Sequence, residues 1–377
     1  MYKNLILLIL FVLLLSAAVW FGSLPGRAQQ SPPPDASWTP TTPVKTGEFR
    51  GISLQLDAPH LDHPYETFIS EIARTGANTI NLVVHGYQEN VKSTSIFLDN
   101  RKVPSDEHLE RLIRFARKKK LRVMLMPVVL LARRSGSDWR GKIAPDDWDQ
   151  WWEDYTQFIL RYANLAGRSG VEVFSVGSEL ISTETHTARW KELIAKVRQA
   201  FPGRLTYSAN WDHYEAPKFW SDLDIVGMTT YFTLAKGTEP KLQEMLDSWG
   251  NIKGDILRWQ KTVNRPILFT EVGWPNQVTA AEFPWNYYAS PNKPDPQQQA
   301  DCFESFFRTW SREQAVAGFL VWEWRNFPDQ PTDPQTDTSY RPVGKPAMRV
   351  VQKYLLAPDA FAETQPAPAG QPVSLSR

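Results

Sequence analysis

Two glutamates in this sequence each stand at the end of a short apolar run. Glu179 follows the run of residues 171–178, and Glu271 follows the run of residues 266–270. Short apolar runs of this kind are typical of buried β-strands. Where two such strands end at the same edge of a sheet, their final carboxyl groups can face each other across a bound ligand. One carboxyl can then donate a proton while the other attacks or activates water, which is the chemistry of glycoside hydrolysis.

A structural role is the alternative for each glutamate, because acidic side chains are favoured in the first turn of a helix. Either residue alone fits that interpretation about as well as a catalytic one. Both residues together, each ending an apolar run and accompanied by Trp322 and Trp324 in the last such run, favour the catalytic interpretation.

Eight apolar runs predict the strands that would position these side chains. They span residues 49–54, 79–85, 122–128, 171–178, 205–210, 224–230, 266–270 and 318–324. Helical patterns fill the gaps, one opening at Ser105 and a second beginning near Pro145 with tryptophans at helical spacing. Eight strand–helix units in residues 48–357 predict a single α/β domain, a (β/α)8 TIM barrel. A doubly wound open sheet is the alternative, but no GxGxxG or Walker loop follows the first strand.

The alternation of side chains along a strand predicts which residues face the barrel interior. In residues 171–179 the predicted inner face comprises Val171, Val173, Ser175, Gly177 and Glu179. In residues 266–271, Ile267 and Phe269 would share the inner face with Glu271. Because the active site of such a barrel lies at the C-terminal ends of its strands, both glutamates are expected at its mouth.

The residues around both glutamates resemble the signatures of the large clan of retaining glycosidases on (β/α)8 barrels. The matching stretches are Val176-Gly177-Ser178-Glu179 and Phe269-Thr270-Glu271-Val272-Gly273-Trp274. Within that clan the chain is most similar to glycoside hydrolase family 113, whose characterised members act on β-mannan. Supporting stretches are Arg50-Gly51-Ile52-Ser53, Asn210-Trp211-Asp212-His213, Met228-Thr229-Thr230-Tyr231 and Val321-Trp322-Glu323-Trp324. The resemblance extends from Phe49 to Leu355.

The resemblance implies a role for each matching residue. Glu179 would be the acid/base, Glu271 the nucleophile, and Tyr231 the residue that hydrogen-bonds the nucleophile. Trp322 or Trp324 would form the platform under the cleaved sugar, and alternation places both on one face of the last predicted strand.

Ser178 departs from the clan pattern. Most members have Asn directly before the acid/base, where it contacts the sugar 2-OH. The shorter serine hydroxyl would not make the same contact, so another group, such as Asn210, would have to supply it. This departure bears on the sugar specificity more than on the mechanism.

Other residues near predicted strand ends are candidates for substrate binding. They are His85, which could also cap its strand, Asn210, Trp211 and Trp274, which could line the cleft or pack beneath it. Two long loops, residues 86–104 and 276–296, would build the walls of a cleft. The second loop contains four aromatic residues that would form a stacking surface if exposed: Phe283, Trp285, Tyr287 and Tyr288.

Composition argues against several other classes of protein. The 42 basic and 41 acidic residues leave a net charge of +1, which gives no reason to expect a nucleic-acid partner. A single cysteine, Cys302, excludes an intrachain disulfide and a cysteine-based zinc site. The six histidines show no ligand spacing, so neither a catalytic metal nor another cofactor is expected. We expect a monomer that binds a polysaccharide or oligosaccharide.

The ends of the chain have compositions of their own. Residues 1–28 contain an apolar run, Leu5 to Phe21, that predicts either a cleaved signal peptide or a retained membrane anchor. Residues 29–47 form a Pro-rich linker, and residues 358–377 predict a disordered tail. The protein is therefore expected to be exported, either anchored at the outer face of the membrane or released to the periplasm or medium.

The sequence thus predicts a retaining glycoside hydrolase that cleaves a β-linked glycan, with β-mannan favoured, by double displacement. Retention requires two carboxyl groups about 5–5.5 Å apart. A non-catalytic glycan-binding or envelope protein on a decayed barrel is an alternative from a different class. A transglycosylase that remodels cell-envelope polysaccharide is another, since it would use the same residues with a sugar as acceptor in place of water.

Overall fold

The computed structural model describes residues 43–57, 63–288, 293–324 and 333–356. These residues all belong to one compact unit, residues 38–377. The predicted signal or anchor segment, most of the linker and the predicted tail lie outside the described residues. Among the described residues, no helix has the length and apolar character needed to span a membrane.

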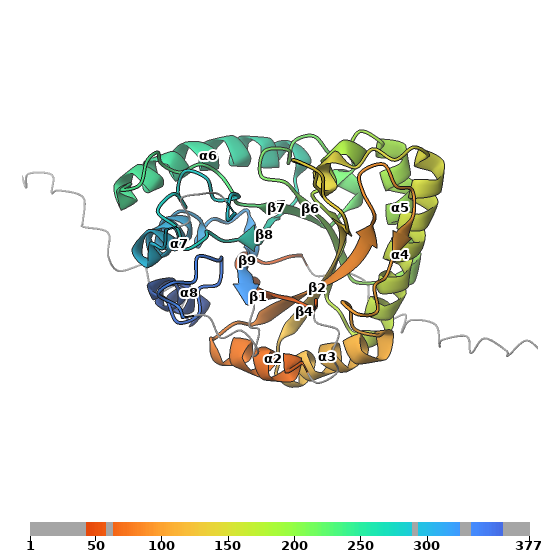
Figure 1. The fold of residues 1–377 in the computed structure, drawn as a ribbon, viewed down its shortest axis with the longest axis horizontal. Helices are drawn as coiled ribbons and strands as arrows, with labels where there is room; N and C mark the ends of the chain where they lie inside the picture. Colours follow the sequence, from red (N-terminus) through yellow and green to blue (C-terminus); the bar gives the residue numbers. More distant parts are fainter. Residues whose placement is uncertain (1–42, 58–62, 289–292, 325–332, 357–377) are drawn as a thin grey trace, which may run out of the picture. The chain divides into compact units, whose positions relative to one another are not determined.

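Eight parallel strands close into a barrel, as predicted (Figure 1). They are β1 (Phe49–Gln55), β2 (Thr79–Gln88), β4 (Arg122–Leu131), β5 (Val173–Ser178), β6 (Arg204–Ala209), β7 (Ile225–Thr229), β8 (Ile267–Val272) and β9 (Val316–Trp324). The barrel closes because β1 pairs with both β2 and β9. A short strand, β3 (Ile96–Phe97), adds an antiparallel pair to the end of β2. All eight predicted strands are present, although β2 and β4 extend three residues further than expected.

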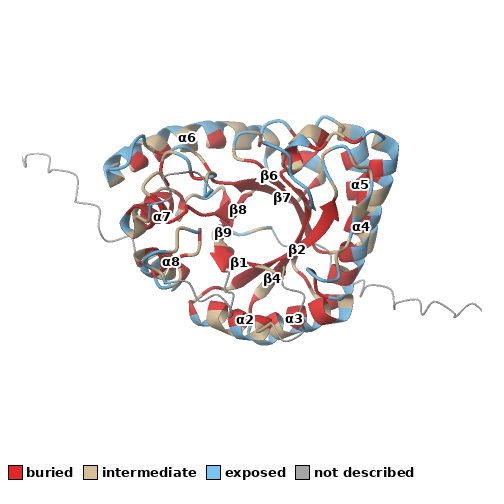
Figure 2. Cartoon of the chain, in the orientation of Figure 1, coloured by how far each residue is buried: buried red, intermediate tan, exposed pale blue. Residues whose placement is uncertain are grey.

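Seven α-helices surround the barrel in the part of the chain that the structure describes. They are α2 (Tyr65–Arg74), α3 (Asp106–Lys118), α4 (Trp148–Ser169), α5 (Thr187–Ala200), α6 (Leu242–Val263), α7 (Pro296–Trp310) and α8 (Pro346–Leu356). Ser105 caps α3 by accepting a hydrogen bond from the His108 N–H, and Asp147 caps α4 in the same way. Each helix turns a buried stripe towards the strands and an exposed one towards solvent (Figure 2).

The connection between β6 and β7 differs from the prediction that helices fill every gap. It contains a single turn of 3-10 helix, η3 (Trp220–Asp222), and no α-helix. Pro217 interrupts this segment, and a proline in a helix interior removes a hydrogen bond and clashes with the preceding turn. Side-chain contacts hold this segment. The Trp220 indole donates to the Tyr214 carbonyl oxygen at 2.9 Å, and the Tyr214 and Trp220 rings pack edge-to-face against Trp259.

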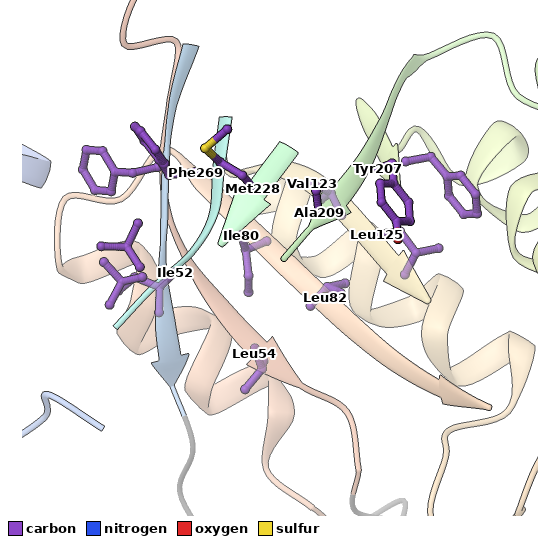
Figure 3. Close-up of a cluster of buried hydrophobic side chains, with 14 of the residues drawn as sticks. Ile52, Leu54, Ile80, Leu82, Val123, Leu125, Tyr207, Ala209, Met228 and Phe269 are labelled. Carbon is purple, nitrogen blue, oxygen red and sulfur yellow. The ribbon is translucent and has the colours of Figure 1, made fainter. Parts of the chain in front are cut away.

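The outward side chains of the strands form the main core of the molecule. Figure 3 shows part of this layer, which includes Ile52, Leu54, Ile80, Leu82, Val123, Leu125, Tyr207, Ala209, Met228 and Phe269. These side chains pack against the apolar stripes of the helices. Burial of so much apolar surface supplies most of the favourable free energy of folding.

The interior of the barrel is apolar in one part and polar in another. Its apolar cluster comprises Phe49, Val83, Met124, Met126, Val128, Val173, Ile225, Leu268, Ala317 and Leu320. Hydroxyl groups pair elsewhere in the interior, where the Ser208 and Thr270 oxygens lie 2.6 Å apart. At the N-terminal end of β6, Arg204 forms an ion pair of 2.8 Å with Glu48. These pairings satisfy part of the buried polar surface, since most buried polar groups in proteins are hydrogen-bonded.

Two glycines test this packing with the same substitution. Gly51→Ala would place a Cβ 2.5 Å from the Thr79 carbonyl oxygen on the neighbouring strand, whereas a Cβ at Gly250 in α6 has no heavy atom within 4 Å. We expect Gly51→Ala to lower the free energy of unfolding by about 1–3 kcal/mol. Gly250→Ala should raise it by up to about 1 kcal/mol, because alanine favours a helix. Urea denaturation of both variants measures the difference, and equal effects would contradict the packing described.

Candidate active site

The ends of β5, β7 and β8 bring the two predicted glutamates into one cluster. Glu271 is the register partner of Thr229, and the Thr229 hydroxyl donates to Glu179 Oε1 at 3.3 Å. Glu179 is 6% exposed and Glu271 is 3% exposed. The charge of Glu179 also raises the pKa of Glu271, so the two carboxyl groups lie within electrostatic reach of each other.

A bulge in β8 turns Glu271 towards the interior. Met228 pairs with Phe269, but the next residue of β7, Thr229, pairs with Glu271, so β8 contains one extra residue. The Phe269 ring packs outwards against Phe306 and Trp310. The prediction that Ile267 and Phe269 share a face with Glu271 is therefore wrong, because simple alternation fails where the extra residue is inserted.

A second irregularity lies at the end of β5. The register with β6 shifts between Ser175 and Ser178, and a Cβ on Gly177 would lie 2.7 Å from the Tyr155 hydroxyl in the outer layer. Gly177 thus faces away from the interior, contrary to the prediction that it shares the inner face with Glu179. Glu179 follows with a φ of 51°, a left-handed conformation that residues with a side chain rarely adopt.

Arg140 is the first residue of this site that the sequence did not reveal. It lies in η1 (Arg140–Lys142), in the connection between β4 and α4. Its guanidinium donates to Glu179 Oε2 at 2.5 Å and to the Ser178 carbonyl oxygen at 3.2 Å. Burial raises the pKa of Glu179, and the Arg140 charge opposes that shift. A lone arginine in an irregular loop has no pattern that would have identified it.

Glu271 is held by one of the residues that the resemblance singled out. The Tyr231 hydroxyl donates to Glu271 Oε2 at 2.8 Å. Glu271 Oε1 has no hydrogen-bond partner among the described residues, although it is buried. Burial first and the Glu179 charge second raise the pKa of Glu271 to about 8. Within the described part of the chain, one oxygen of this carboxyl is thus held by Tyr231 and the other has no partner.

Two further polar residues belong to the cluster and were not predicted. Glu323 is 7% exposed and also raises the pKa of Glu271. The Gln55 side-chain amide at the end of β1 donates to Glu323 Oε2. Gln55 and Glu323 both lie at the C-terminal ends of strands, where polar residues are candidates for the site. The predicted first strand stops at residue 54, one residue before Gln55.

The two candidate platform tryptophans lie in different layers. Trp322 is partly exposed and packs against the interior cluster, whereas Trp324 is 6% exposed and belongs to the outer core. The peptide bond between Trp322 and Glu323 is cis. Because the two tryptophans pack in different layers, the prediction that they share one face is wrong, and of the two Trp322 is the one at the barrel interior.

Trp274 takes the second of the two places that the sequence left open for it, because it packs beneath the cleft and does not line it. It is 0% exposed and packs edge-to-face against Phe303 and Trp249 in the outer layer. A side chain that is covered on all sides cannot stack on a sugar. Its role is packing, because the strand bulge before it directs it towards the helices.

Of the remaining candidates, Asn210 lies at a strand end as predicted, whereas His85 lies within β2, three residues before the end of that strand. His85 is 2% exposed and alternates along β2 with the interior residue Val83. Asn210 follows β6, and its side-chain amide donates to Asp212 Oδ1 at 2.6 Å. The Ser178 hydroxyl is buried and has no partner among the described residues.

A pocket of about 520 Å³ opens in the connection between β6 and β7. It is lined by Trp211, Asp212, His213, Tyr214, Glu215, Ala216, Lys218 and Phe232. The Trp211 ring stacks on Trp285, with ring centroids 5.4 Å apart and planes inclined by 16°. The Trp211 N–H donates to the Thr229 hydroxyl, which itself donates to Glu179. This hydrogen-bond chain connects the pocket to the carboxyl cluster.

Loop residues 276–288 expose the predicted aromatic surface. Phe283 is 40%, Trp285 37%, Tyr287 46% and Tyr288 71% exposed. Among the described residues, no three His, Cys, Asp or Glu side chains are grouped to hold a metal ion. The site contains carboxyl groups, amides and hydroxyls with aromatic faces nearby, and such groups bind and cleave sugars.

A closed parallel barrel with two buried carboxyl groups at its C-terminal mouth defines the class of barrel glycoside hydrolases. Residues 63–345 match the model of Glycoside Hydrolase Family 113, and this match covers well over half of the chain. The chain therefore belongs to glycoside hydrolase family 113, in agreement with the resemblance noted in the sequence. A comparison with curated proteins gave no significant match.

Solved structures of the family have the same fold. A β-mannanase of family 113 from Alicyclobacillus acidocaldarius, in complex with ManMIm, is 26% identical with a TM-score of 0.75, covering 84% of this chain and all of that one. A family 113 β-1,4-mannanase is 24% identical with a TM-score of 0.73, covering 82% and 99%. A family 5 mannosidase from Rhizomucor miehei, at 10% identity and a TM-score of 0.57 over 83% and 93%, shares the fold alone.

The raised pKa of Glu271 predicts a pH-dependent cost of keeping its carboxyl. Unfolded, this group ionises near pH 4.5, whereas in the folded protein it keeps its proton until about pH 8. Stability from the protonated form is present below pH 4.5 and is lost as the pH rises towards 8. Glu271→Gln should therefore raise the free energy of unfolding, with a larger gain at pH 8 than at pH 5.

Denaturant unfolding at the two pH values measures this gain. Glu153→Gln, at an exposed position of α4, is the control and should change stability little at either pH. A gain at Glu271 that is the same at pH 5 and pH 8 would contradict the raised pKa.

Proposed function

We propose that the protein hydrolyses β-mannan or a related β-linked glycan with retention of configuration, using Glu271 as nucleophile and Glu179 as acid/base. The observation that carries this proposal is the pair of buried carboxyl groups at one barrel mouth, one oriented by Tyr231 and the other by Arg140. Burial away from water raises the pKa of both carboxyl groups, so the pair tends to hold one proton. One acid and one base are what the first step of double displacement needs.

In the first step Glu271 attacks the anomeric carbon while Glu179 protonates the leaving oxygen, and the glycosidic bond breaks. In the second step Glu179 removes a proton from water, which displaces Glu271 and releases the sugar. Tyr231 favours the ionised nucleophile because its hydroxyl donates to that carboxylate. Arg140 favours the ionised form of Glu179, so the proposed roles require this ion pair to loosen when the glycan binds.

Mannan is the favoured substrate because the chain belongs to family 113 and two similar structures are described as β-mannanases. The identity to these proteins is 24–26%, and Ser178 occupies the position where most of the clan has Asn. The Asn210 amide is engaged with Asp212 and would have to turn to reach a sugar hydroxyl. The reaction type therefore has stronger support than the choice of sugar.

Endo-acting cleavage is the mode that we propose. The pocket beside Trp211 lies beyond the carboxyl cluster and offers room for further sugar units. Trp285 stacks on Trp211 in the wall of this pocket, and Phe283 packs edge-to-face on Trp285; such aromatic faces stack on sugar rings. A site that binds several units at once favours cleavage within a chain over removal of a terminal unit.

Export is proposed from the sequence. The apolar run near the N-terminus and the Pro-rich linker after it would carry the barrel across a membrane and hold it there or release it. Polysaccharide substrates lie outside the cell, so this location suits the proposed activity. Fractionation of cells into membrane and soluble parts would distinguish a retained anchor from a cleaved signal.

The catalytic assignment predicts the effect of two substitutions. Glu179→Ala and Glu271→Ala should each lower kcat on mannan at least about a thousandfold, since each removes a group that acts in the transition state. Glu172→Ala is the control and should retain activity, because Glu172 lies directly before the N-terminal end of β5, away from the barrel mouth. Assays of reducing ends on mannan, glucomannan and xylan measure the rate and choose the sugar.

Proton NMR should show that the first-formed product has the same anomeric configuration as the substrate. An inverted product or unchanged hydrolysis by Glu271→Ala would contradict the proposal. Absence of any hydrolysis by the wild type, with binding to the glycan preserved, would favour the glycan-binding alternative. Transfer to a sugar acceptor in preference to water would identify a transglycosylase.

The distal pocket predicts a dependence on substrate length. Trp285→Ala removes the ring that stacks on Trp211, so kcat/KM on mannan should fall about two- to tenfold. A short aryl glycoside that does not reach the pocket should be cleaved as by the wild type, and Trp285→Phe should retain most of the activity on mannan. Equal losses on long and short substrates would argue against a distal subsite.

A further inference from the structure

We propose that Glu184 and Tyr207 are positioning residues that hold the acid/base Glu179 through the peptide N–H of Leu180. This inference rests on the proposed role of Glu179. It goes beyond that role because neither residue contacts the Glu179 side chain or was expected from the sequence to take part in the site. Both lie behind the end of β5, on the side of the helices.

A chain of two hydrogen bonds carries the proposal. The Leu180 N–H donates to the Tyr207 hydroxyl oxygen at 2.9 Å. The Tyr207 hydroxyl in turn donates to Glu184 Oε1 at 2.8 Å. Leu180, Tyr207 and Glu184 are 1%, 0% and 2% exposed, so water does not compete for these bonds.

The backbone of Glu179 needs this support. Its φ of 51° is unfavourable for a residue with a side chain, and the ladder between β5 and β6 ends at Ser178. Beyond the ladder, the Glu179 N–H donates to the Ser208 carbonyl oxygen at 2.8 Å, and the Leu180 N–H donates to Tyr207. These two bonds flank Glu179 and fix the direction in which its side chain leaves the backbone.

A carboxyl group at Glu184 suits this role better than a neutral group would. A hydroxyl that donates to a carboxylate becomes a stronger acceptor, because hydrogen bonds in a chain polarise one another. Burial raises the pKa of the Tyr207 hydroxyl well above its ordinary range, so that hydroxyl keeps the proton it donates. Glu184 therefore strengthens the hold of Tyr207 on the Leu180 peptide.

Glu184 is also a costly residue for packing alone. Its Oε2 is buried without a hydrogen-bond partner among the described residues, and burial raises its pKa to about 7. An unsatisfied buried oxygen lowers stability. A side chain with this cost, linked through Tyr207 to the peptide that follows the proposed acid/base, is explained by a contribution to the reaction.

Tyr155 provides a matched control for a purely structural effect. Its hydroxyl is buried as well and donates to the Val176 carbonyl oxygen at 2.8 Å, on the same strand. It therefore anchors β5 three residues before Glu179 but makes no bond to the peptides that flank Glu179. Tyr155→Phe and Tyr207→Phe remove the same atom from the same layer.

The test uses aryl β-glycosides of the preferred sugar with good and poor leaving groups, and kcat/KM of the full-length protein. A poor leaving group needs protonation, whereas dinitrophenolate does not, so a displaced acid slows only the first class. Tyr207→Phe should lower kcat/KM about tenfold or more on the poor leaving group and less than about threefold on dinitrophenyl glycoside. Glu184→Gln should show the same selectivity with a smaller loss, since its amide oxygen still accepts from Tyr207.

Glu179→Ala serves as the reference for this pattern. If it shows no selective loss on poor leaving groups, the proposed function fails. If it does, while Tyr207→Phe and Glu184→Gln change both substrates equally, as expected for Tyr155→Phe, the positioning role is overturned. Should Tyr207→Phe fail to fold, the selectivity of Glu184→Gln decides the matter.

Discussion

The desolvation of two carboxyl groups in one barrel mouth is the constraint on which this structure depends. Glu179 and Glu271 are both buried, and burial raises the pKa of each. Their mutual repulsion raises the pKa of Glu271 further, so ionising both at once is unfavourable. The groups around them adjust this balance: Arg140 stabilises a charge on Glu179, and Tyr231 stabilises one on Glu271. Such a pair tends to keep one proton between the two carboxyl groups, as the proposed mechanism requires.

Irregular backbone, more than regular strands, places these two side chains. The bulge in β8 turns Glu271 inwards although Phe269 faces the helices. At the end of β5, the register shift and the positive φ of Glu179 do the same for the other carboxyl. Each irregularity lowers the stability of the fold, and the packing of the outer core offsets this loss. The regular part of the barrel thus stabilises the fold enough to tolerate the irregular backbone at the mouth.

Much of the fold could be predicted because it depends on patterns that repeat. Apolar runs located all eight strands, and Ser105 marked the start of α3. Strand ends also pointed to both glutamates. A bulge, by contrast, is defined by the register with a neighbouring strand, so alternation within β8 gave the wrong face for Phe269.

Residues whose role depends on three-dimensional contacts could not be predicted in the same way. Arg140 lies in an irregular loop and reaches Glu179 only through the fold. Trp274 and Trp324 follow or end apolar strands just as a sugar-binding tryptophan would, yet packing buries both. In the sequence, Tyr207 is an ordinary strand residue. Its proposed role depends on hydrogen bonds to Leu180 and Glu184, which only the folded structure brings close to it.

The missing helix between β6 and β7 links the fold to the proposed substrate. A helix there would pack against the outside of the barrel, as the other helices do. Instead the connection carries Trp211 and Asp212 at the edge of an open pocket. Asp212 raises the pKa of Glu179, and the Trp211 peptide bonds to Thr229 beside that carboxyl. A sugar bound in this pocket would therefore change the surroundings of Glu179, the proposed acid/base, so that binding of a long glycan and catalysis would be coupled.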